Sequence, residues 1–168
     1  MNLVVAVDQN WGIGYHGQLL FHVSADMKHF RALTANHALV YGRKTLETFP
    51  HQRPLPHRTN YILSRNPNYT VPDAIVVHDT AELLRQLHDV PHDQIDVIGG
   101  ASVYHALLPY CSVAHVTKFE SAKPADAFFP NLDTDQAWTL HERGADQTTE
   151  DGLVFHFDTY YNTKVFDF

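Results

Sequence analysis

The sequence has very little cysteine and no long hydrophobic run. Its one cysteine, Cys111, cannot form an intramolecular disulfide, which suits a reducing compartment. The apolar run over residues 3–7 is too short for the core of a signal peptide and has no basic leader, and no apolar stretch of about 18 residues follows. We therefore expect a cytoplasmic protein without a membrane partner.

Positive charge is also scarce. The chain has 12 Lys and Arg against 19 Asp and Glu, a formal net charge of −7, and no run of basic residues. Nucleic acids and anionic membranes attract Lys and Arg, so we expect no nucleic-acid partner. The 13 histidines include no H-E-x-x-H spacing and no cluster with cysteine, which predicts that the protein has no metal site.

What the sequence does contain is enough apolar material, 44% of 168 residues, for one core in a single domain spanning residues 1–168. Segments of high β-propensity alternate with helical patterns until the last third, where only strands are expected. This order predicts an α/β fold with one mixed sheet of about eight strands, mostly parallel with an antiparallel C-terminal edge, flanked by about four helices. The expected strands are 3–7, 38–41, 60–64, 74–77, 96–98, 113–119, 138–142 and 154–161, and the expected helices are 24–35, 42–49, 80–87 and 101–108. Ser24 and Thr80 are the expected caps of two of these helices, and the first should turn Met27, Phe30, Leu33 and Thr34 inward.

Residues 12–17 spell the G-x-G-x-x-G pattern of dinucleotide-binding proteins. That pattern has its usual meaning only where the glycines open a helix whose N-terminus meets a pyrophosphate. Here no helix cap appears before Ser24. We interpret the glycines instead as a mobile loop, of the kind that often covers an active site.

Asp26 is the only acidic residue between Asp8 and Glu47, and apolar residues surround it in sequence. One interpretation is a solvent-exposed carboxylate that the helix dipole favours. The other is a carboxylate in an apolar pocket, able to bind a cationic or amidine-like ring and to relay a proton.

Three expected strands end in groups that suit phosphate. Gly42-Arg43-Lys44-Thr45 follows one strand, Ser64-Arg65 follows a second, and Gly99-Gly100-Ala101-Ser102 follows a third. Each ending alone is also typical of a turn with a solvated cation. Three such endings at one edge of a sheet favour a long diphosphate cofactor lying across it.

These segments, taken in order, resemble the dihydrofolate reductase family of the bacterial type along nearly the whole chain. The segments that carry the resemblance are Ala6-Val7-Asp8, Gly12-Ile13-Gly14, Ala25-Asp26-Met27 with Phe30, residues 42–49, residues 53–60, Leu63-Ser64-Arg65, residues 97–104, Val116-Thr117, Asp126 and Phe129-Pro130. The resemblance implies that the protein is a monomeric NADPH-dependent oxidoreductase that reduces dihydrofolate, and that the Gly99-Gly100 peptide is cis.

The resemblance also implies residue roles. Asp26 and Thr117 are the expected catalytic pair, which grips the 2-amino group and N3 of a pterin while hydride passes to C6 and a proton to N5. Arg58 is expected to bind the α-carboxylate of the glutamate, with a bidentate guanidinium. The expected substrate-binding residues are Val5, Ala6, Asp26, Met27, Phe30, Phe49, Leu55, Arg58 and Thr117. The expected cofactor-binding residues are Ala6, Ile13, Gly14, Leu19, Gly42, Arg43, Lys44, Thr45, Leu63, Ser64, Arg65, His78, Ile98, Gly99, Gly100, Ala101, Ser102 and Val103. Arg43, Ser64 and Arg65 would surround the 2′-phosphate that distinguishes NADPH from NADH.

The chain departs from the family pattern in two places. Leu19-Leu20-Phe21 replaces Leu-Pro-Trp, so a ring remains and an indole N–H donor is lost. Pro124-Ala125-Asp126-Ala127 replaces Glu-Gly-Asp-Thr and keeps only the aspartate. Two alternatives stay open: a reductase of this fold acting on another pterin or a pyrimidinone, and a non-catalytic ligand-binding protein.

Overall fold

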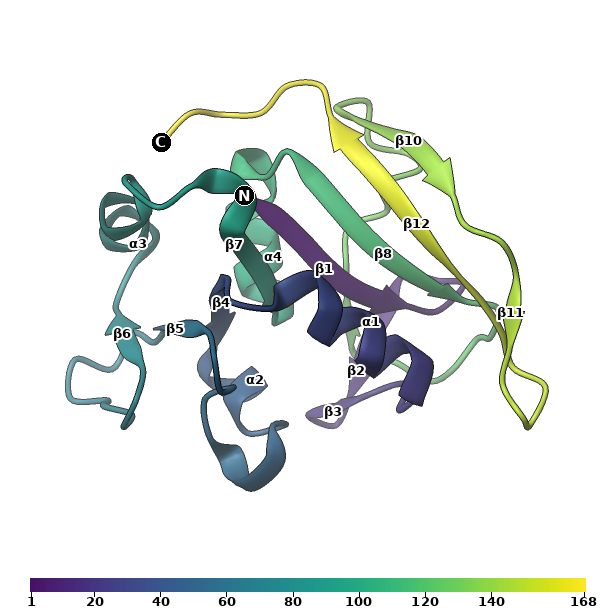
Figure 1. The fold of residues 1–168 in the computed structure, drawn as a ribbon, viewed down its shortest axis with the longest axis horizontal. Helices are drawn as coiled ribbons and strands as arrows, with labels where there is room; N and C mark the ends of the chain where they lie inside the picture. Colours follow the sequence, from purple (N-terminus) through teal and green to yellow (C-terminus); the bar gives the residue numbers. More distant parts are fainter.

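A computed structural model describes all residues, 1–168, and its centre is a twisted mixed sheet (Figure 1). The strand order is β10-β12-β8-β1-β7-β4-β5-β6, and β11 pairs with β12. All pairings from β8 to β6 are parallel, whereas β12 runs antiparallel to β8, β10 and β11. The mostly parallel sheet with an antiparallel C-terminal edge is therefore confirmed.

The bounds of eight sheet strands follow the expected ranges closely, whereas β11 was not expected. The strands are β1 (Asn2–Val7), β4 (Ala38–Gly42), β5 (Thr59–Leu63), β6 (Ile75–Val77), β7 (Ile95–Gly99), β8 (Val113–Phe119), β10 (Trp138–Arg143), β11 (Gln147–Thr148) and β12 (Val154–Asn162). In β4, Leu39 and Tyr41 pack into one hydrophobic cluster, while Ala38 and Val40 belong to the larger one. The strand is thus buried on both faces, which is why it reads as a continuous apolar run.

Four α-helices flank the sheet: α1 (Ser24–Thr34), α2 (Arg43–Leu46), α3 (Thr80–Leu87) and α4 (Ala101–Leu107). Figure 1 shows α1 in front of the sheet and α4 behind it. Short 3₁₀ turns occur at Pro50–Gln52, His92–Gln94 and Leu108–Tyr110. No helix is both long and apolar enough to span a bilayer.

Several local expectations were wrong. The cap of α3 is Asp79, whose carboxylate accepts a hydrogen bond from the Glu82 amide at 2.7 Å, and α1 begins after Val23 without a side-chain cap. The second helix ends at Leu46 rather than Phe49. Met27, expected to face inward, is 56% exposed.

The glycine segment is a small sheet of its own. β2 (Gly12–Tyr15) pairs with β3 (Gln18–Leu19) and with β9 (Ala127–Phe128), and no helix follows the glycines directly. A Cβ on Gly12 would come within 2.9 Å of the Ala125 Cβ, so β2 packs closely against the 125–128 segment. The dinucleotide interpretation of the motif is therefore excluded, and the expected loop is in fact a paired hairpin.

Candidate active site

Asp26 lies in the first turn of α1, and its carboxylate meets the sheet. Its Oδ1 accepts a hydrogen bond of 2.7 Å from the hydroxyl of Thr117, which is buried on β8. Asp26 itself is only partly exposed. Burial raises the pKa of the Asp26 carboxyl, while the Thr117 hydrogen bond and the nearby His29 act in the opposite direction. The interpretation of Asp26 as a fully exposed helix-end carboxylate is therefore wrong.

Two further side chains interact electrostatically with Asp26 and were missed by sequence reasoning. His29 lies one helical turn after Asp26 and stacks on Phe157, with ring centroids 3.9 Å apart; burial lowers the His29 pKa and the Asp26 charge partly restores it. Tyr104 is buried and donates a 2.7 Å hydrogen bond to the Val4 carbonyl; burial, and then the Asp26 charge, raise the pKa of its phenol. The i, i+3 spacing could have revealed His29, whereas nothing local marks Tyr104.

The neighbouring strands β1 and β7 complete this side of the site. Ala6 is the register partner of Thr117, and Val5 is the partner of Val116, so β1 runs directly beside the Thr117 side of the pair. Phe49, Leu55 and Ile98 pack on one hydrophobic cluster built around β4 and β5. The expected substrate residues on strands thus fall into two groups, one beside the Asp26–Thr117 pair and one on the cluster around β4 and β5, and Phe30 of α1 is half-buried.

The glycine-containing segments at the ends of β4 and β7 lie side by side, as predicted from the sequence. These strands are neighbours, and the peptide between Gly99 and Gly100 is cis. Gly99 has φ of 144°, and a Cβ there would lie 2.9 Å from the Thr45 hydroxyl. The helices that start at Arg43 and Ala101 have no side-chain cap, so their first N–H groups remain available to an anion.

Two cations flank these endings, Arg43 at the start of α2 and Arg65 after β5. The Arg43 guanidinium lies over the Tyr69 ring, 4.5 Å from its centroid, and its Nε is 4.0 Å from the Glu47 carboxylate. The backbone of Ser64 is held by the His78 Nδ1, 2.8 Å from the Ser64 carbonyl oxygen. Arg65 is exposed and its side chain makes no ion pair. The edge therefore offers glycine backbone, hydroxyls and two accessible guanidinium groups in a row.

The remaining expected cofactor residues lie on both sides of this edge. Lys44 is exposed in α2, Leu63 ends β5, and Ser102 and Val103 lie in the first turn of α4. Ile13 and Gly14 are on β2, and Leu19, the register partner of Gly14, is 52% exposed on β3.

Arg58 lies before β5 with an incomplete set of partners. Its Nη1 donates to the Pro56 carbonyl at 3.2 Å, but its buried Nε has no hydrogen-bond partner. Burial and the nearby Arg31 lower the pKa of the guanidinium. A buried, unpaired donor next to a second cation favours the binding of an external carboxylate.

Phe21 is held from two sides where the family pattern has tryptophan. It is 8% exposed and stacks on Phe119, with centroids 4.1 Å apart. The Lys123 ammonium lies 4.6 Å from the centre of the Phe21 ring and donates a 2.9 Å hydrogen bond to the Leu20 carbonyl. Asp126, the aspartate that survives in the altered segment, accepts a 3.1 Å hydrogen bond from the His16 amide. The 123–126 segment therefore fixes the stretch between β2 and α1.

The fold and this site define an α/β protein with its candidate ligand-binding groups at the carboxyl edge of a mainly parallel sheet. A family model described as dihydrofolate reductase matches residues 1–162, and the chain belongs to the dihydrofolate reductase family. A dihydrofolate reductase of Enterococcus faecalis, solved in complex with NADP(H) and RAB-propyl, superposes with a TM-score of 0.85 at 30% identity, covering 96% of this chain and 95% of that one.

Curated relatives agree with this assignment. A dihydrofolate reductase of Bacillus subtilis is 31% identical over 83% of this chain and 80% of its own length. A bifunctional dihydrofolate reductase-thymidylate synthase of Daucus carota is 35% identical over 96% of this chain, which spans only 34% of that protein. The chain thus corresponds to about a third of the bifunctional relatives and to most of the shorter ones.

Proposed function

We propose that the protein catalyses the NADPH-dependent reduction of 7,8-dihydrofolate to 5,6,7,8-tetrahydrofolate. The observation that carries this proposal is the partly buried Asp26 carboxylate hydrogen-bonded to Thr117, in a chain whose family is dihydrofolate reductase. Residues 1–168 act as one monomeric domain. The reaction takes place in the cytoplasm, where the buried thiol of Cys111 stays reduced.

The residues present fit NADPH. The Thr45 hydroxyl leaves no room for a Cβ at Gly99, so the backbone there must be glycine. A diphosphate would receive N–H groups from both helix starts. Arg43, Ser64 and Arg65 would hold a 2′-phosphate, and Ala6, Ile13 and Gly14 would lie at the nicotinamide end. When bound, the cofactor supplies the hydride.

Asp26 has two tasks in the proposed reaction. Its carboxylate, held in place by the Thr117 hydroxyl, accepts hydrogen bonds from the 2-amino group and N3 of the pterin. Burial raises the pKa of this carboxyl, which makes it a better proton relay when N5 is protonated. The rings of Phe30 and Phe49 and the aliphatic side chain of Leu55 would exclude water on the apolar side.

Arg58 distinguishes dihydrofolate from a simpler ring. A substrate that carries glutamate would place a carboxylate against the guanidinium and satisfy the donor that the protein leaves unpaired. A pterin or pyrimidinone without glutamate would leave this buried donor unpaired, at a cost of roughly 1–3 kcal/mol.

The test is a spectrophotometric assay of NADPH oxidation with dihydrofolate and, separately, with a dihydropterin that lacks glutamate. We expect turnover with dihydrofolate, and we expect Arg58→Gln to raise KM for dihydrofolate at least about tenfold while leaving the glutamate-free pterin unaffected. Arg53→Gln, at an exposed position nearby, is the matched control. Turnover with the glutamate-free pterin alone would favour the alternative substrate class, and no turnover with either would favour a ligand-binding protein.

A further inference from the structure

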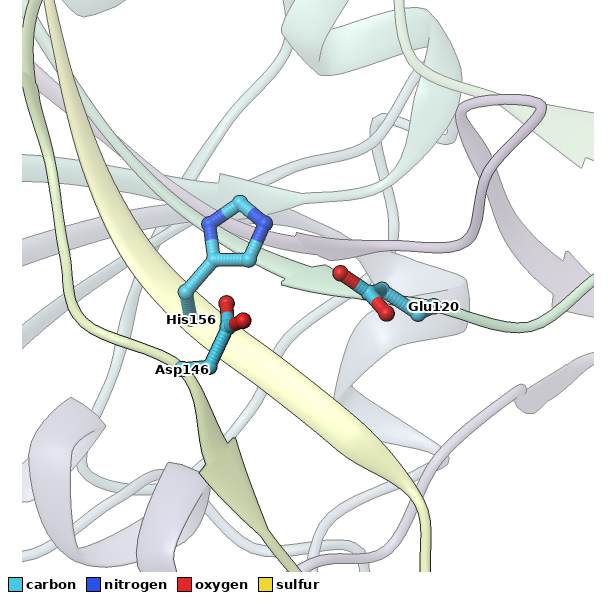
Figure 2. A group of neighbouring side chains, drawn as sticks. All are labelled: Glu120, Asp146 and His156. Atoms are coloured by element: carbon cyan, nitrogen blue, oxygen red, sulfur yellow. The ribbon is translucent and has the colours of Figure 1, made fainter.

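Three potential ligand groups from separate parts of the chain gather at the C-terminal edge of the sheet. Glu120 follows β8, Asp146 precedes β11 and His156 lies on β12. One ligand atom from each lies within 4.8 Å of the other two. Figure 2 shows the three side chains together. None of the three is among the residues proposed to bind substrate or cofactor.

His156 is oriented as metal-binding histidines usually are. Its Nδ1 is 2.6 Å from Oδ1 of Asp158, and the two side chains are only 9% and 1% exposed. In the neutral ring this pairing places the proton on Nδ1 and leaves the Nε2 lone pair free. Nε2 has no hydrogen-bond partner in the protein, and Figure 2 shows a ring nitrogen turned toward Glu120. A carboxylate behind one ring nitrogen, with the other nitrogen free, is the usual support of a metal ligand.

The charges around the cluster leave it negative. The Asp146 Oδ1 receives Arg143 Nη2 at 2.8 Å, and its second oxygen is unpaired. Lys118 is engaged by Asp133 at 3.2 Å and by Asp158 at 3.7 Å. The Glu120 side chain is exposed and makes no hydrogen bond or ion pair.

We propose that Glu120, Asp146 and His156 bind a divalent transition-metal ion of the Zn²⁺ type, with water in the fourth position. One imidazole and two carboxylates suit Zn²⁺, whereas Mg²⁺ and Ca²⁺ prefer oxygen ligands alone. Tetrahedral ligands at bonds of about 2.0–2.2 Å lie about 3.3–3.5 Å apart. The two carboxylates are exposed and can rotate to close the remaining distance.

A cavity beside the cluster would give the ion access from solvent, and the weak pairing of β11 gives it a structural role. A cavity of about 130 Å³, lined by His156, Glu120 and Lys118 among others, adjoins the cluster. β11 pairs with β12 at only two register positions, Gln147↔Phe155 and Thr148↔Val154. An ion at this position would therefore fasten the exposed hairpin to the end of β8 and stabilise the native sheet.

Titration of the full, metal-free chain without a histidine tag tests the proposal. Calorimetry with Zn²⁺ should show one tight 1:1 event, and Zn²⁺ at about a hundredfold over Kd should raise Tm by on the order of 5 °C. Glu120→Gln plus Asp146→Asn should weaken that event at least about tenfold and abolish the Tm rise. Glu142→Gln plus Glu150→Gln removes the same charge from exposed positions outside the cluster and should leave binding unchanged.

NMR of the histidine rings identifies the ligand directly, since His156 is too buried to replace safely. The His156 imidazole signals should shift with one equivalent of Zn²⁺ in the wild type and in the Glu142/Glu150 control. Absence of a 1:1 event, equal binding by the Glu120/Asp146 variant, or shifts confined to other histidines would overturn the proposal.

Discussion

At the scale of single residues, Asp26 carries a conflict between stability and the proposed function. The fold withdraws a carboxylate from water and gives it one neutral hydroxyl donor, so its pKa rises. Such a group stabilises the native state less in its charged form than in its protonated form. Measuring both kcat/KM and Tm of the Asp26→Asn variant separates the effect on activity from the effect on stability.

Replacement of Asp26 by Asn should lower kcat/KM for dihydrofolate at least about a hundredfold at neutral pH, a typical contribution of acid–base catalysis. The residual activity should rise as pH falls, because the proton must then come from solvent. Steady-state assays across pH check this. Near-normal activity with an unchanged pH profile would show that Asp26 has no role in proton supply.

The same substitution should raise the stability of the protein at neutral pH. The folded pKa of Asp26 lies above its unfolded value of 3.8, so the folded state binds the proton more tightly. The free energy of unfolding of the wild type therefore falls as pH rises from the unfolded pKa through the higher folded pKa of Asp26. The Asn variant has no titrating group at this position and does not lose this stability. Its Tm should exceed the wild-type Tm at pH 7, and the difference should shrink below pH 3.8. Equal Tm values at every pH would contradict the pKa shift.

At the scale of elements, sequence patterns predict all eight strands in the order from β10 to β6, whether buried or exposed. β1 and β4 are buried apolar runs whose pattern needs no knowledge of their partners, whereas β10 is mostly exposed. The strands that sequence patterns miss are β2, β3, β9 and β11, which are only two to four residues long, and the pairing of β2 with β9 is also non-local, as between Gly12 and Phe128. In the site, the Asp26–Thr117 pair was expected from the family resemblance. The contact of Lys123 with Phe21 was not expected, because it joins segments about a hundred residues apart that no local sequence signal connects.

Removal of the Lys123 ammonium should loosen the segment that enters α1. Lys123→Met keeps the aliphatic stem but loses the bond to the Leu20 carbonyl and the contact over the Phe21 ring. A loss of about 1 kcal/mol predicts a KM for dihydrofolate that is about fivefold higher. Kinetics with a parallel Tm measurement check this, and Lys164→Met at the exposed C-terminal end is the control. A changed Tm with unchanged KM would assign Lys123 a purely structural role.

Gly144 is required by close packing of β12. Its amide donates a 2.9 Å hydrogen bond to the Phe157 carbonyl, and a Cβ would overlap that same oxygen. Gly144→Ala should therefore lower the free energy of unfolding by about 1–3 kcal/mol. Urea denaturation measures the loss, with the exposed Gln147→Ala on the same hairpin as control. An unchanged midpoint would mean that the hairpin moves aside at little cost.

At the scale of the whole molecule, we propose that three strand ends and two helix starts bind one cofactor together. NADPH should raise Tm more than NADH at equal concentration, because ligand binding to the native state alone stabilises it. Arg43→Ala plus Arg65→Ala should erase most of that difference, since each charge-assisted bond is worth roughly 1.5–3 kcal/mol. Arg85→Ala on α3 is the control. Equal stabilisation of the unmodified protein by both cofactors would refute the 2′-phosphate site.

The position of β12 has a consequence for synthesis on the ribosome. Residues 154–162 fill the place between β8 and β10, pairing from Phe155↔Phe119 to Tyr161↔Val113 on one side. During translation β8 therefore emerges well before its neighbour, with an unpaired edge and apolar side chains such as Phe119. The nascent sheet cannot close until residue 162 has left the exit tunnel. A ribosome that stops before residue 154 releases a chain with an open, aggregation-prone edge rather than a smaller folded protein.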